Sequence, residues 1–164
     1  MALGSGLMAR ITFTGLDGYI ASLERLGKST EKAAGKAVYE AAGILADEVK
    51  EGIQGLDTGD KTPQETERRE KQKEGLVKSF GIAGIREDNG FINVLVGFEG
   101  YNDVRTQKFP QGQPNQMVAR IFNSGTSHNR KQPFFDGAVR DTKSRAKAKM
   151  KEVFENEIEK TMKE

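Results

Sequence analysis

The residues best suited to chemistry in this chain surround its single histidine, His128. It lies in the stretch NSGTSHNRKQPFF, from Asn123 to Phe135, among hydroxyl, amide and basic side chains. An imidazole beside hydroxyl groups could serve as a general base, and the neighbouring cations could bind phosphate. The same residue types also suit a structural loop that anchors the start of a following helix.

His128 lacks the partners that such chemistry needs. No Asp or Glu lies within seven residues of it, and the chain has no cysteine, so a zinc site at this position has no local ligands. Hydroxyls next to a histidine in sequence do not make a catalytic triad, because triad members meet only in three dimensions. We therefore predict no catalytic, cofactor-binding or metal-binding residue and a protein that is not an enzyme.

The same stretch is better interpreted as a turn that anchors a helix. Gly125 permits a backbone turn that other residues resist, and Pro133 fixes the direction in which the chain approaches the helix. Asp136 is a good helix N-cap, and Phe135 could fold back on the first turn against the stem of Arg140 or against Val139. We expect the side chains of residues 128–130 at the exposed tip of the turn.

The composition indicates a small core. The chain has 164 residues, Lys plus Arg of 26 and Asp plus Glu of 24, a net charge of +2, and only 35% apolar residues. Such a chain often finishes burying its apolar surface against neighbouring subunits. The sequence shows no signal peptide and no apolar run approaching the ~20 residues of a membrane span, so we expect no membrane association and synthesis in a cytoplasm.

The hydrophobic pattern predicts an α+β fold of one domain, residues 1–164, with a small antiparallel sheet packed against a long helix in the N-terminal half and a C-terminal helix. Asn89-Gly90 supplies the residues of a type I′ turn. The predicted elements are a strand near residues 9–14, helices over 18–27, 30–54 and 136–162, a hairpin over about 80–98, and a short strand or helical turn over 116–122.

Other segments carry little apolar sequence. We predict a flexible leader over residues 1–8 and long mobile loops over residues 55–75 and 99–115. Residues 55–75 are either an exposed loop or a solvated helix that becomes ordered only against a partner.

The predicted C-terminal helix carries a basic stretch with two interpretations. It could face the phosphates of DNA without reading bases, or it could be a solvated face whose side-chain stems cover apolar surface. The basic residues are Arg140, Lys143, Arg145, Lys147, Lys149 and Lys151.

The order of short motifs resembles a family of small tail-completion, or neck, proteins of long-tailed bacteriophages. A GTS…QPF…A run precedes the last helix, and a TG…L..S pattern precedes the hairpin. The matching residues are Gly125, Thr126, Ser127, Gln132, Pro133, Phe134 and Ala138 in the first pattern, and Thr58, Gly59, Leu76 and Ser79 in the second. The chain departs from the family pattern by inserting charged residues 60–75.

The resemblance implies a structural virion protein that joins the tail to the DNA-filled head. It implies a homo-oligomeric ring, usually sixfold, whose partners are the tail terminator, tail tube and head-closure proteins, with DNA in the channel. The expected subunit interface comprises Gly125, Thr126, Ser127, His128, Arg130, Pro133, Phe134 and Phe135. The alternatives are a DNA-binding module that uses the basic stretch and a head-completion adaptor on the portal side.

Overall fold

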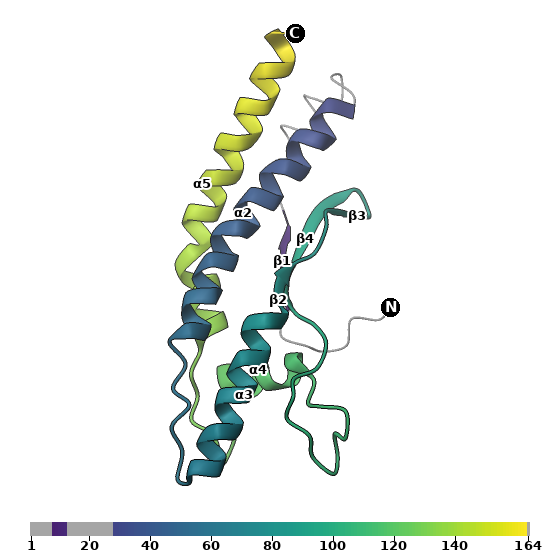
Figure 1. Cartoon of the computed structure of the whole chain (residues 1–164). Helices are drawn as coiled ribbons and strands as arrows, with labels where there is room; N and C mark the ends of the chain where they lie inside the picture. The colour runs from purple at the N-terminus through teal and green to yellow at the C-terminus, as the bar shows by residue number, and fades with distance from the viewer. Residues whose placement is uncertain (1–7, 13–27, 164) are drawn as a thin grey trace. The chain divides into compact units, whose positions relative to one another are not determined.

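The computed structural model describes residues 8–12 and 28–163. In chain order the elements are β1 (Met8–Thr12), α2 (Lys28–Gln54), α3 (Pro63–Ser79), β2 (Phe80–Ile82), β3 (Arg86–Asp88), β4 (Phe91–Phe98), α4 (Asn115–Ser124) and α5 (Phe134–Lys163) (Figure 1). The predicted helix over 18–27 and the predicted leader, apart from Met8, lie outside the described residues. Helices and a small sheet confirm the α+β class.

The chain divides into two compact units, which are described separately below. The first comprises Met1–Ala9, Asp47–Gly81 and Gly97–Arg140, and the second comprises Arg10–Ala46, Ile82–Val96 and Asp141–Glu164. The prediction that residues 1–164 form one domain stays a prediction.

The apolar stripe of α2 is buried as its spacing predicted. Ala-rich positions three and four residues apart put one face of the helix against the core. The buried positions include Ala34, Val38, Ala41, Ala42, Leu45, Val49 and Ile53. In the second unit α2 runs beside α5 (Figure 1), and Lys36 of α2 forms an ion pair with Glu157 of α5 at 2.7 Å.

The sheet has β4 between β1 and β2, and β3 also pairs with β4. The predicted turn is confirmed, because Asn89 and Gly90 have φ of 52° and 80° and β3 pairs antiparallel with β4. Every residue of β4 from Asn93 to Phe98 is buried. Successive side chains point to opposite faces of a strand, so both faces of β4 are covered there.

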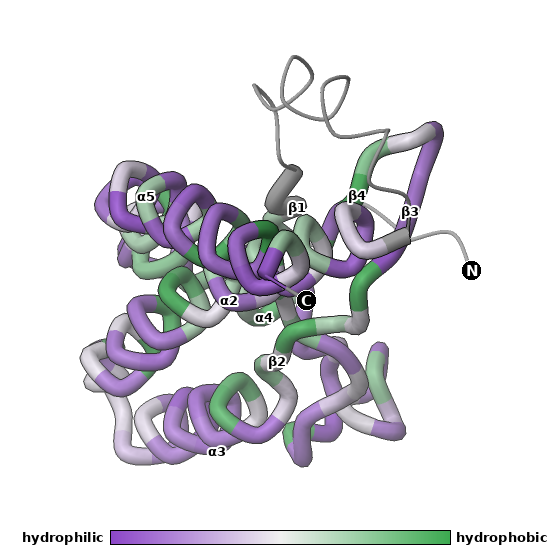
Figure 2. The backbone as a smooth tube through the Cα atoms, turned by 90° about the horizontal axis from the view of Figure 1, so that it is seen from above, coloured by the Kyte–Doolittle hydropathy of each residue, from purple (hydrophilic) through white to green (hydrophobic). Residues whose placement is uncertain are grey.

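Most of the charged segment is a helix, whereas the sequence allowed either an exposed loop or a solvated helix. Residues 63–79 are α3, which is largely hydrophilic (Figure 2). The Thr62 hydroxyl accepts a hydrogen bond from the amide of Glu65 at 3.2 Å and donates one to the Glu65 carboxylate at 3.1 Å. Thr62, Pro63 and Glu65 thus form a helix start whose T-P-x-E pattern is a local signal in the sequence. The mobility of residues 55–75 and 99–115 stays a prediction.

Two further boundaries differ from expectation. Residues 116–122 belong to the ten-residue helix α4, which is neither a strand nor a single turn. Helix α5 begins at Phe134, so Asp136 lies in its first turn and is not the N-cap. Near the ends of α5, Val139 is 38% and Met162 71% exposed, while Ala138 and Thr142 are buried.

Candidate assembly surface

The two sequence motifs meet in the first unit through Gln132 and Asp57. The side-chain carbonyl of Gln132 accepts a hydrogen bond from the Asp57 amide at 2.8 Å, and its NH₂ group donates to the Asp57 carbonyl at 3.0 Å. Asp57 directly precedes Thr58-Gly59, and Gln132 begins the QPF run. Two residues 75 positions apart therefore hold the two motif segments together.

The loop between α4 and α5 is closed by its own backbone and by Thr126. The Thr126 amide donates to the Asn129 carbonyl at 2.9 Å, and the Thr126 hydroxyl accepts from the amides of His128 and Asn129 at 3.2 and 3.1 Å. Gly125 has φ 73°, and a Cβ at this position would lie 2.9 Å from the amide nitrogen of Lys131. This turn therefore requires glycine at 125.

Arg69 of α3 contacts the loop between α4 and α5 through Asn129. Its side chain is 9% exposed, and its Nε lies 2.6 Å from the Asp60 carboxylate while a guanidinium NH₂ group donates to the side-chain carbonyl of Asn129. The backbone amide of Lys61 and the charge of Arg69 lower the pKa of Asp60 below its ordinary value. Arg69, which lies in the charged insertion, therefore links α3 to the loop between α4 and α5. The sequence did not predict this contact.

Asn123 at the end of α4 caps α5 from another element. Its side-chain carbonyl accepts hydrogen bonds from the amides of Phe135 and Asp136, both at 3.1 Å, and its NH₂ group donates to the Asp136 carboxylate at 2.9 Å. The first amides of a helix have no partner within the helix, so this buried side chain satisfies two of them. It takes the role that sequence reasoning gave to Asp136.

Four phenylalanines pack together where α5 begins. The ring centroid of Phe98 lies 5.1 Å from that of Phe80 and 6.2 Å from those of Phe134 and Phe135. Phe135 is only 2% exposed, so its side chain belongs to the core of its own subunit and not to a surface. The predicted staple onto Val139 is replaced by this cluster, because Val139 is exposed.

The remaining residues of the predicted interface lie at or near the surface. Thr126, Ser127, His128, Arg130 and Pro133 are exposed, and Gly125 and Phe134 are half-buried. The prediction that the stretch from Asn123 to Phe135 anchors the following helix is confirmed by the bonds of Asn123 to the first turn of α5, and Arg69 of α3 bonds to Asn129 within the stretch. We call residues 125–131 the motif loop.

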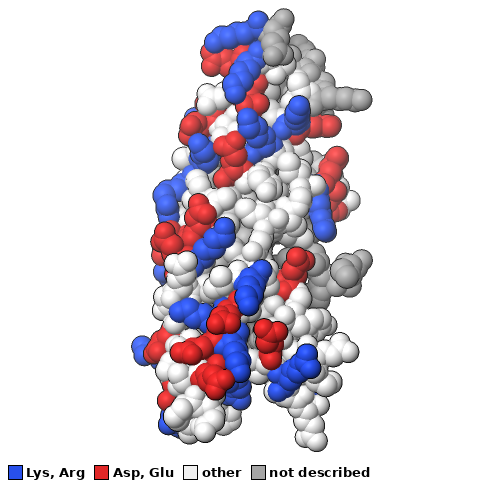
Figure 3. All heavy atoms as spheres, in the orientation of Figure 1, with Lys and Arg blue, Asp and Glu red and all other residues white. Residues whose placement is uncertain are grey.

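The basic residues of α5 do not form one face. At 100° per residue, Arg140, Lys143, Lys147 and Lys151 lie on one flank of the buried stripe, and Arg145 and Lys149 lie on the other. Lys149 and Lys151 pair with Glu152 and Glu155 at 3.6 and 3.9 Å. Lys143 and Lys147 make no ion pair with any described residue. Positive and negative side chains are interspersed on the face in Figure 3.

The described residues contain no group of three His, Cys, Asp or Glu side chains that could hold a metal ion. Within residues 28–163, no helix is both long and apolar enough to cross a membrane.

Comparison with known proteins places the chain in a family. The HK97-gp10-like family model, described as "Bacteriophage HK97-gp10, putative tail-component", matches residues 17–101, which is over half of the chain. The match contains Thr58, Gly59, Leu76 and Ser79 and ends before the motif loop. No curated protein and no solved structure matches. The chain belongs to the HK97-gp10-like family of bacteriophage tail components.

Proposed function

We propose that this tail component is a tail-completion, or neck, protein that joins the tail to the DNA-filled head. In this proposal it is a structural subunit without enzymatic activity, and it assembles into a homo-oligomeric ring of six copies. Its partners are copies of itself and the tail terminator, tail tube and head-closure proteins. It is made in the host cytoplasm and ends in the virion.

The observation that carries this proposal is a surface loop closed by its own hydrogen bonds and contacted by the buried Arg69. The side chains of Thr126, Ser127, His128 and Arg130 are exposed, while the Thr126 hydroxyl and the Thr126 and Asn129 backbone close the turn and Arg69 donates to the side chain of Asn129. A preorganised loop loses little conformational entropy on binding, so it is suited to recognition. We assign Gly125, Thr126, Ser127, His128, Arg130, Pro133 and Phe134 to the subunit interface, with Phe135 as their buried anchor.

Light scattering and native mass spectrometry over a range of concentrations test the proposal, alone and with tail-tube protein. We expect discrete oligomers for the wild-type chain and weaker association for R130E. K50E is the matched control, because Lys50 is exposed on α2 and the charge change is the same. A strict monomer under every condition, including with tail-tube protein, contradicts the proposal.

The second candidate function is binding to duplex DNA through α5, and the unpaired ammonium groups of Lys143 and Lys147 favour it. Phosphate contacts release counterions, so binding should weaken steeply with salt. We expect K143E/K147E to lose affinity and R145E/K149E, with the same charge change on the other flank, to keep most of it. Absence of duplex binding at low salt rejects this candidate.

A further inference from the structure

Arg69 of α3 is the one charged residue among residues 29–163 that is buried. Arginine is almost never buried unless its charge is paired and its donors have acceptors. Here the Asp60 carboxylate lies 2.6 Å from Nε, and a terminal NH₂ group donates to the side-chain carbonyl of Asn129. One guanidinium group therefore joins the segment before α3 to the motif loop.

These contacts continue beyond the guanidinium group at both ends. The Asp60 amide donates to the Thr66 hydroxyl at 3.1 Å, which ties the acid to the start of α3. In the motif loop the NH₂ group of Asn129 donates to the Thr126 hydroxyl at 2.9 Å, and that hydroxyl also accepts from the amides of His128 and Asn129 at 3.2 and 3.1 Å. We call the connected residues the polar relay: Asp60, Arg69, Asn129 and Thr126.

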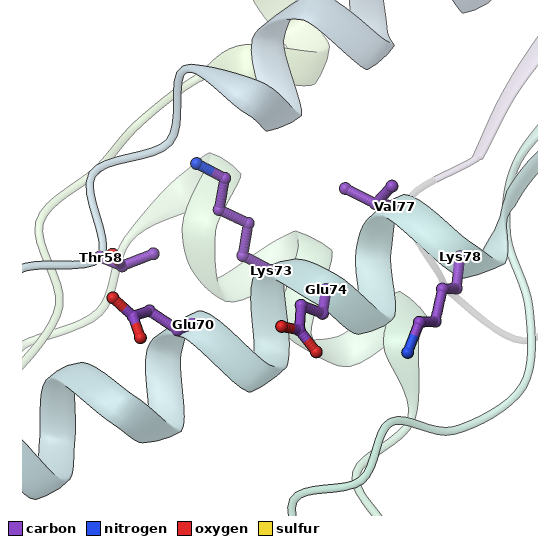
Figure 4. A pocket seen from close by; sticks show the side chains of 6 residues that line it. All are labelled: Thr58, Glu70, Lys73, Glu74, Val77 and Lys78. Carbon is purple, nitrogen blue, oxygen red and sulfur yellow. The ribbon is translucent and has the colours of Figure 1, made fainter.

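The helix that contributes the guanidinium group is itself held in place. Lys73, one turn further along α3, donates to the carbonyls of Gln54 and Leu56 at 2.6 and 3.1 Å, and Figure 4 shows its side chain reaching toward the α2–α3 connection. On the opposite side of the helix, a Cβ added at Gly75 would lie 2.5 Å from the Cβ of Asn102, so the loop after β4 packs directly on the backbone of α3. The arginine therefore projects from a fixed support.

The polar relay determines the backbone from which the exposed side chains of the motif loop project. Ser127, His128 and Arg130 are exposed, and each directly neighbours Thr126 or Asn129 in the chain. None of these three side chains makes a hydrogen bond or ion pair with a described residue. Their placement therefore depends on the turn that Thr126 and Asn129 close.

We propose that Arg69 is a positioning residue of the subunit interface, because it holds the motif loop in the conformation that presents Ser127, His128 and Arg130 to the next copy. The proposal rests on the subunit interface proposed above and names what sets its conformation. Arg69 lies in the charged insertion, residues 60–75, by which this chain departs from the family motif pattern. The insertion thus determines which loop surface this member of the family offers to a partner.

Three substitutions interrupt the polar relay at successive points. R69K keeps a positive charge for Asp60 but lacks the planar fork that also reaches Asn129. N129A leaves the ion pair intact and removes the acceptor in the loop. T126V removes the hydroxyl that accepts two loop amides, whereas T126S retains it.

His128 gives a direct readout of the loop. It is the single histidine of the chain, so its imidazole resonances in a proton NMR spectrum report on the motif loop alone. At concentrations below self-association, we expect R69K, N129A and T126V to shift these resonances and T126S to keep the wild-type positions. Light scattering at higher concentration should show self-association weakened by about tenfold or more in the three shifted variants, because the loop is no longer preorganised.

Two controls separate positioning from general destabilisation. R68K makes the same substitution at the adjacent exposed position of α3. V94A removes buried apolar volume from β4 in the second unit and lowers stability there. Both should leave the His128 resonances and self-association unchanged.

The outcomes distinguish this proposal from the ring. Unchanged His128 resonances in N129A and T126V overturn it even if R69K fails to fold, and so does an equal shift in V94A. Shifted resonances with wild-type self-association overturn the link between the loop and the interface. A wild-type chain that is monomeric under every condition overturns the ring, and shifted resonances would then still support Arg69 as the residue that positions the loop.

Discussion

The Gln132 side chain makes two hydrogen bonds with the backbone of Asp57, accepting from its amide at 2.8 Å and donating to its carbonyl at 3.0 Å. An amide side chain carries a donor and an acceptor side by side, so it can bond to the N–H and the C=O of one residue at the same time. This pairing joins the residue before Thr58-Gly59 to the residue before Pro133.

We expect Q132A to lower the free energy of unfolding by about 1–2 kcal/mol, because two hydrogen bonds between segments are lost. Q132E keeps the acceptor and removes the donor, so it should give an intermediate loss. Urea denaturation followed by circular dichroism measures both. Q107A changes an exposed position between β4 and α4, and its free energy of unfolding should stay within about 0.5 kcal/mol of the wild-type value. An unchanged urea midpoint for Q132A would show that the two hydrogen bonds between Gln132 and Asp57 do not stabilise the fold.

N123A should be more damaging, with a loss of about 2–3 kcal/mol, since the side chain is 1% exposed and its removal leaves two amides of the first turn of α5 without a partner. The same urea titration measures this loss. N156A, on the exposed side of α5, is the control and should leave the midpoint within error. Equal stability of the two variants would show that the cap of α5 lies elsewhere.

The ion pair between Lys36 and Glu157 predicts a pH dependence in the second unit. Hydrogen bonds from Lys36 and Lys160 lower the pKa of Glu157 to about 2. A carboxyl with a lowered pKa stabilises the folded state above its unfolded value of 4.5, and this contribution is lost as the pH falls toward 2.

The matching experiment compares melting temperatures of wild type and E157Q. The wild-type chain should melt higher at pH 7, and the difference should shrink below pH 4.5 and vanish near pH 2. E155Q is the control, since Glu155 pairs with Lys151 only at 3.9 Å. A difference that is independent of pH would exclude the charge of Glu157 as its source.

Residues 55–75 and 99–115 should exchange their amide hydrogens faster than α2 in the free protein. They bury few apolar side chains, and regions with few such contacts open at low free energy. Hydrogen exchange with mass spectrometry checks this, and within the second segment the amide of Asn102 should exchange more slowly than that of Lys108. Protection equal to that of α2 in both segments would contradict their mobility.

Local features of the fold could be predicted from the sequence because they depend on neighbours along the chain. The stripe of α2 follows from helical spacing, and the β3–β4 turn follows from the positive φ that Asn89-Gly90 tolerates. The helix start at Thr62, with Glu65 three residues later, depends on neighbours along the chain in the same way.

The tertiary structure decided which residues meet. The sequence suggested Asp136 as the cap of α5, and the family resemblance suggested Phe135 as an interface residue, whereas Asn123 caps the helix and Phe135 packs against Phe98. A buried helix end takes whichever polar group the packing brings to it, and a side chain is buried by neighbours from other segments. The sequence by itself determined the helical stripe of α2, the β3–β4 turn and the motif order that indicates the family. The partners of Gln132, Arg69 and Asn123 come from segments that only folding brings together.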